Sequence, residues 1–166
     1  NRMGRFLSAL HIGDPQGDPL TPFQTGIASR SGQWFQYAHL DIVKCATKRP
    51  WSHLSGPEQT LLFDNCQPFL EQQLREREEL KLVLLNGRTV FKHSYQFLSE
   101  RFGFQPSRMG LDLGDTSCEL WFGSLQLASR SVAVVGWSAN IVNGHLTKTA
   151  LRTLIERIRA ACPVFG

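Results

Sequence analysis

The sequence lacks any long hydrophobic run, and no stretch approaches the roughly 20 apolar residues that a membrane helix needs. Its N-terminus also lacks the charged-then-apolar pattern of a signal peptide. We therefore expect a cytoplasmic protein with no membrane partner. Cysteine is sparse as well, because the four cysteines are widely scattered and none forms a CxxC pair. This spacing argues against a disulfide framework and a complete zinc site, so we expect reduced thiols.

The 166 residues, of which 42% are hydrophobic, match the size of one ordinary domain with a buried core. The net charge of +4 and the pI near 9.1 permit binding to a polyanion without requiring it. No repeat or low-complexity tract is visible, and we expect a monomer. The chain opens at Asn1 inside a helical pattern, which predicts that further sequence precedes it.

The pattern of apolar residues and turn signals predicts strands alternating with helices. Ser55 and Glu58 form a capping-box pattern with Pro57 at the first helical turn, which predicts a helix from there to about Glu79. A helical tail over residues 1–12 precedes a loop that extends to about Gly32. The other predicted elements are strands over residues 34–45, 80–87, 118–127 and 131–137, and helices over 89–101 and 147–161.

Strands separated by helices imply right-handed crossovers and a largely parallel sheet, so we predict an α/β fold. In such sheets ligands bind at the carboxyl ends of the strands. The loops that follow Val43, Leu85 and Val135 are therefore the places where we expect a functional site.

Three segments, Leu40–Cys45, Asn65–Leu74 and Leu82–Arg88, together resemble the middle of uracil-DNA glycosylase superfamily proteins. Those proteins have a strand ending in Lys-Cys, a helix carrying Cys-x-Pro, and a strand closed by a Gly-Arg turn. The resemblance implies a three-layer α/β/α domain over residues 1–166 with a mainly parallel central sheet. It also implies that the family's first strand and its first motif, which carries the water-activating residue, lie before Asn1.

The function implied by the resemblance is DNA repair, by a hydrolase that cleaves the N-glycosidic bond of a flipped, damaged or deaminated base. Two departures favour a different reading, a non-catalytic nucleic-acid-binding or interaction module that keeps the fold. Asp41 stands where the family has a base-reading asparagine, and an ionised carboxylate can only accept hydrogen bonds. The family's C-terminal His-Pro-Ser motif has Gly136-Trp137-Ser138-Ala139-Asn140 as its counterpart, without the histidine.

The residues that we expect to contact the base come from these strand ends and from the loop after the last strand. They are Asp41, Asn86, Trp137, Ser138 and Asn140. Each also has a structural interpretation. Asp41 could cap a helix or pair with a lysine, and Asn86 precedes Gly87 in a common turn dipeptide. The loop after the last strand could be an ordinary connection.

The residues that we expect to contact DNA phosphates are Lys44, Lys48, Asn143, His145 and Lys148. Cations, amides and imidazoles along one rim provide such contacts. Surface cations with no partner would look the same in sequence, and Asn143-Gly144 is also a turn signal.

The resemblance places Cys45 and Cys66 where the iron–sulfur branch of the family has two cluster ligands. Such clusters need four thiolates, and Cys118 and Cys162 do not match the other two positions. We therefore predict no metal and no cofactor, and interpret Cys66 as core packing on the apolar face of its helix.

Overall fold

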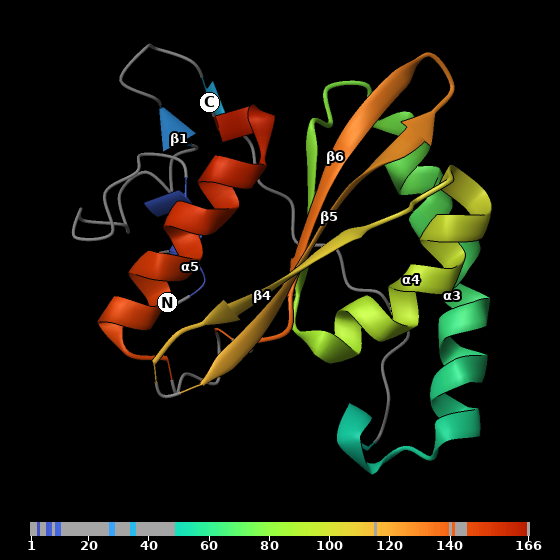
Figure 1. Ribbon diagram of the computed structural model, residues 1–166. Coiled ribbons are helices and arrows are strands. Elements are labelled where there is room, and N and C mark those ends of the chain that lie inside the picture. The colour runs from blue at the N-terminus through green and yellow to red at the C-terminus, as the bar shows by residue number, and fades with distance from the viewer. Residues whose placement is uncertain are drawn as a thin grey trace.

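The computed structural model describes residues 3, 6, 7, 9, 10, 27, 28, 34, 35, 49–114, 116–139, 141 and 146–165. This part of the chain forms an α/β fold with a four-stranded mixed sheet and three α-helices (Figure 1). None of the helices in it combines the length and the apolar character required to cross a membrane.

The sheet has the strand order β3-β6-β5-β4, formed by Leu82–Asn86, Arg130–Trp137, Ser117–Leu127 and Ser107–Asp112. Strands β3 and β6 are parallel, whereas β6 with β5 and β5 with β4 are antiparallel. The prediction of a mainly parallel sheet is therefore wrong. The physical reason for the mixed sheet is the short connection between β5 and β6, in which Leu127 pairs with Arg130. A loop of two residues closes an antiparallel hairpin and is far too short for a parallel crossover.

The three helices predicted after residue 50 are confirmed with small shifts at their ends. Of the helical tail predicted over residues 1–12, the described residues 3, 6, 7, 9 and 10 are helical. Helix α3 spans Gly56–Glu76, beginning with the predicted capping box between Ser55 and Glu58 and ending before the predicted Glu79. Helices α4 and α5 span Arg88–Phe102 and Lys148–Ala161. Two short 3₁₀ helices complete the set, η1 at Trp51–His53 and η2 at Pro163–Phe165.

Helices cover both faces of the sheet, with α5 on one side and α3 and α4 on the other (Figure 1). Alternate residues of each strand serve the two faces, as a pleated strand requires. On β6, Val135 packs with α5 and with the N-terminal helical residues Phe6 and Leu10, whereas Val134 packs with α3 and α4. Burial of apolar side chains on both faces is the main stabilising contribution to such a fold.

The guanidinium of Arg130, the first residue of β6, joins the end of α3 to the sheet. It donates to the carbonyl oxygens of Leu74 at 3.2 Å, Glu78 at 2.6 Å and Leu80 at 3.1 Å. The last carbonyls of a helix have no partner within the helix. Arg130 supplies one here and so fixes how α3 leads into β3.

A separate two-stranded sheet corrects the N-terminal prediction. Strand β1, Ile27–Ala28, pairs in antiparallel fashion with β2, Trp34–Phe35. The loop predicted to reach Gly32 therefore contains a strand. The strand predicted over residues 34–45 begins in this small sheet, and its residues 36–45 lie outside the described residues.

Candidate site at the carboxyl ends of β3 and β6

The carboxyl ends of β3 and β6 lie side by side, because Leu85 pairs with Gly136 and Asn86 with Trp137. The contact continues beyond the strands: the Gly87 N–H donates to the Trp137 carbonyl at 2.9 Å, and the Arg88 N–H donates to the Ser138 carbonyl at 3.3 Å. The predicted parallel pairing of the strands that end near Leu85 and Val135 is thus confirmed. The strand predicted to end near Val43 lies outside the described residues.

Trp137 is not part of a loop, because it is the last residue of β6 and is fully buried. Its indole packs against Phe6 with ring centroids 5.0 Å apart, and its Nε1–H donates to Asn86 Oδ1 at 2.8 Å. The indole is packed inside the protein because Ala133, Val135 and Trp137 share the α5 face of β6, so the strand pattern continues to the tryptophan. The contact of Trp137 with a base stays a prediction.

Ser138 follows β6 directly and is tied to β5. Its N–H donates to the Glu119 carbonyl at 2.9 Å, and its Oγ accepts from the Glu119 N–H at 2.9 Å. The Ser138 hydroxyl also lies 3.7 Å from Cys118 Sγ as a hydrogen-bond donor. The side chain predicted to contact a base thus forms hydrogen bonds within the protein.

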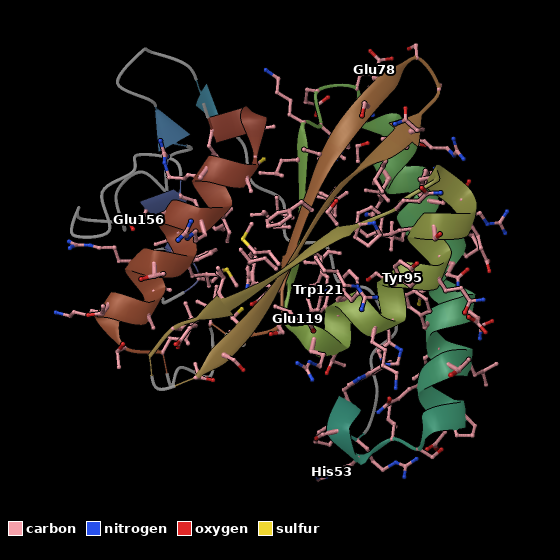
Figure 2. All side chains as sticks on the ribbon, in the orientation of Figure 1. His53, Glu78, Tyr95, Glu119, Trp121 and Glu156 are labelled. Atoms are coloured by element: carbon pink, nitrogen blue, oxygen red, sulfur yellow. The ribbon has the colours of Figure 1, made fainter. Side chains whose placement is uncertain are left out.

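Two exposed charges that the sequence analysis did not select lie at this edge. The Arg88 guanidinium, at the first residue of α4, is 3.7 Å from the Glu119 carboxylate, and the two side chains are 72% and 42% exposed. Figure 2 shows Glu119 and Trp121 on β5 beside the first turns of α4. A pair this exposed contributes little to stability, so both groups remain accessible to a ligand. The Gly87-Arg88 turn after a buried strand was the signal that could have identified Arg88.

The remaining predicted site residues are divided between the described and undescribed parts of the chain. Lys148 is described and exposed, at the first turn of α5 behind the N-cap residue Thr147. The others lie outside the described residues; they are Asp41, Lys44, Lys48, Asn140, Asn143 and His145. Of the predicted set, the structure therefore brings together Asn86, Trp137 and Ser138.

Two cavities among the described residues lie away from this edge. The larger, of about 490 Å³, is lined by Glu78, Lys81 and Ser131 at the amino ends of β3 and β6. The smaller, of about 280 Å³, is lined by Ser107, Phe122 and Cys162, among others. Neither is lined by Asn86 or Ser138. These two cavities are therefore separate from the polar edge formed by Asn86 and Ser138.

The perturbed ionisable groups also lie elsewhere. The Ser55 backbone N–H and hydroxyl, both donating to the Glu58 carboxylate, hold the pKa of Glu58 below its usual range at the start of α3. Partial burial lowers the pKa of His93, and burial raises the pKa of the Cys162 thiol. These shifts have capping and packing as their causes.

Within the described ranges, no three His, Cys, Asp or Glu side chains gather in a way that could hold a metal ion. Cys66 is buried, with an exposed fraction of 1%, and occupies the apolar face of α3 as core packing requires. Cys45, the other residue considered for an iron–sulfur cluster, lies outside the described residues.

No protein-family model, no curated protein and no solved structure matches the chain.

Proposed function

We propose that this chain is a DNA-binding domain of three-layer, uracil-DNA glycosylase-like architecture that hydrolyses the N-glycosidic bond of a flipped base. The observation that carries the proposal is the parallel pairing of β3 and β6, which places Asn86, Arg88 and Ser138 at one carboxyl edge. Ligands bind at this edge in open α/β sheets. Excision of a base requires that it first leave the helical stack, so the protein must hold an opened DNA strand.

The proposed division of labour follows from the chemistry of each group. Water adds to the sugar carbon as the bond to the base breaks, and the base leaves with the bonding electrons and takes up the proton that the water loses. An acid or amide side chain positions this water. Asp41 accepts hydrogen bonds from the edge of the base, and the exposed Arg88 and Lys148 contact phosphates. The reaction uses water alone and needs no metal or other cofactor.

A module that binds nucleic acid without cleaving it is the second candidate. The hydrogen bonds within the edge favour it, because Asn86 Oδ1 accepts from Trp137 and Ser138 Oγ accepts from the Glu119 N–H. A base would have to replace these internal bonds in order to use the same atoms. The described edge also carries the exposed carboxylate of Glu119, and the nearby Arg88 offsets its negative charge.

One experiment separates the two candidates. Labelled oligonucleotides, single-stranded and duplex, with and without uracil, are titrated with the protein, and excision is measured as strand cleavage by hot alkali at the abasic site. Binding with cleavage supports the glycosylase. Binding without cleavage supports the module, and absence of binding to every oligonucleotide contradicts both.

Asp41 provides a test of base preference, because its substitution restores the donor that the family's asparagine provides. Asp41→Asn is expected to increase the binding or excision of uracil relative to the unmodified protein. One good hydrogen bond to a base edge contributes about 1–3 kcal/mol of discrimination. The same oligonucleotides measure the change. A lower melting temperature with unaltered base preference would instead identify Asp41 as a structural carboxylate.

Lys148 provides a test of the DNA surface. If its ammonium contacts a phosphate, Lys148→Gln should weaken DNA binding and reduce the slope of log K against log[salt] by about 0.7–0.9, the value for one lost contact. Fluorescence anisotropy between low and moderate salt measures the slope. Lys81→Gln is the matched control, since Lys81 is exposed at the amino end of β3, opposite the proposed edge. Equal slopes for both variants would exclude Lys148 from the interface. The same test applies to Lys48.

A further inference from the structure

Strand β4 forms one edge of the four-stranded sheet and pairs only with β5 among the described strands. Its residues Ser107–Gly110 and Asp112 are exposed, and Leu111 alone is buried. Such an edge presents backbone N–H and C=O groups that can pair with another strand.

The pairing with β5 determines which residues of β4 direct their backbone groups outward. The Leu113 N–H donates to the Thr116 carbonyl at 2.9 Å, in continuation of the register in which Asp112 faces Ser117. Backbone groups alternate between the two sides of a strand. Leu113, Leu111 and Met109 therefore point theirs toward β5, and the residues that point theirs away from it are Arg108, Gly110 and Asp112.

A second copy of β4 can use all of these outward groups in one register. Antiparallel pairing about a two-fold axis through Gly110 places Gly110 opposite its counterpart and Arg108 opposite Asp112. Because of the symmetry, the Arg108–Asp112 pair occurs twice. Opposite charges directly across a ladder are stabilising, whereas like charges are destabilising. The charges of β4 therefore favour the same register as its backbone.

The side chains of β4 leave room for a second copy of the strand. A Cβ added at Gly110 would have no neighbouring atom within 4 Å, so the centre of the edge is open. On the other face of the strand, Met109 is 41% exposed, and it would lie opposite Leu111 of the second copy. Pairing would thus cover an exposed apolar side chain.

We propose that β4 pairs with β4 of a second copy of this chain, in antiparallel register about Gly110, to form a dimer with one continuous sheet. The sequence led us to expect a monomer, and it did not predict β4 as a strand. The proposal is independent of the function at the carboxyl edge of β3 and β6.

Charge exchange tests the register. Sedimentation velocity over a range of concentrations should show a monomer–dimer equilibrium for the unmodified protein. Arg108→Asp should weaken the dimer about tenfold, because both cross-strand pairs become repulsive, and Asp112→Arg should do the same. An equimolar mixture of the two variants should dimerise as well as the unmodified protein, since each copy then places the opposite charge across from its partner. Arg157→Asp, at an exposed position of α5, is the matched control and should leave the equilibrium unchanged.

A second measurement covers the case in which Asp112→Arg disturbs the fold, because Asp112 Oδ1 also accepts from the Gly114 N–H at 2.9 Å. In the unmodified protein, amide hydrogen exchange at Arg108, Gly110 and Asp112 should slow as the protein concentration rises, and exchange at Met109 and Leu111 should not change. A monomer at every concentration would overturn the proposal. A dimer whose strength is unaffected by Arg108→Asp would overturn it too.

Discussion

Replacing Trp137 by alanine should lower the free energy of unfolding by about 3–5 kcal/mol, the usual cost of removing a large buried aromatic side chain. Trp137 is fully buried, packs against Phe6 and donates to Asn86 Oδ1. The substitution leaves a cavity between the sheet and α5 and removes the donor for Asn86. Urea denaturation followed by circular dichroism measures the change without depending on tryptophan fluorescence.

Trp137→Phe separates the contribution of apolar packing from that of the hydrogen bond to Asn86. Phenylalanine keeps most of the apolar contact and removes the Nε1–H donor, so we expect a smaller loss, of about 1–3 kcal/mol. The sequence-based prediction gives a different result, because a tryptophan that contacts a base from an exposed loop can be removed without loss of stability. Unchanged stability with loss of DNA binding in Trp137→Ala would restore that interpretation of the residue.

Local signals were sufficient for most of the helices and strands. The capping box of Ser55 and Glu58 placed the start of α3, and Thr147 placed the start of α5, because these caps satisfy backbone N–H groups that the first turn leaves without partners. The apolar run before Asn86 placed β3. The sequence also predicted that β3 and β6 run parallel, because both read as buried strands of one largely parallel sheet.

Strand β4 and the mixed sheet were not predicted, because both depend on how the strands pair with one another. Strand β4 has the sequence Ser-Arg-Met-Gly-Leu-Asp, in which only Met109 and Leu111 are apolar, at alternate positions. Two apolar residues are a weak strand signal, so its pairing with β5 makes it a strand. The mixed sheet was not predicted, because helical crossovers were expected between the strands. A short turn connects β5 and β6 instead.

The sequence also predicted only part of the candidate site, because some of its contacts join segments that are far apart in the chain. Asn86 and Ser138 were found because strand ends are recognisable in sequence. The Arg88–Glu119 pair was missed because its two members are 31 positions apart and meet only when α4 and β5 are both in place. Nothing local in the sequence distinguishes Glu119 from the other exposed carboxylates.

The position of α4, and with it that of Arg88, depends on aromatic packing over β5. The rings of Phe91 and Trp121 stack with centroids 3.8 Å apart and an interplanar angle of 11°, and Phe104 lies at 6.5 Å from Phe91. Figure 2 shows Trp121 beside the first turns of this helix, with Tyr95 further along it. Gly123 makes room for the ring of Phe104, because a Cβ there would lie 2.7 Å from Phe104 Cε2 and 3.1 Å from the Gln105 carbonyl oxygen.

Gly123→Val should therefore destabilise the protein by about 1–3 kcal/mol or more, because Phe104 is fully buried and its ring cannot move without displacing the neighbouring aromatic side chains. Movement of α4 would also shift Arg88 relative to Glu119, so DNA binding at the carboxyl edge should weaken in the fraction that remains folded. Gly110→Val is the matched control: it introduces the same side chain on the neighbouring strand in open space, and dilute protein avoids any effect of association. Valine favours strands, so Gly110→Val should be neutral or slightly stabilising. Equal urea midpoints for the two variants would show that Phe104 can be accommodated elsewhere and that the aromatic packing does not determine the position of α4.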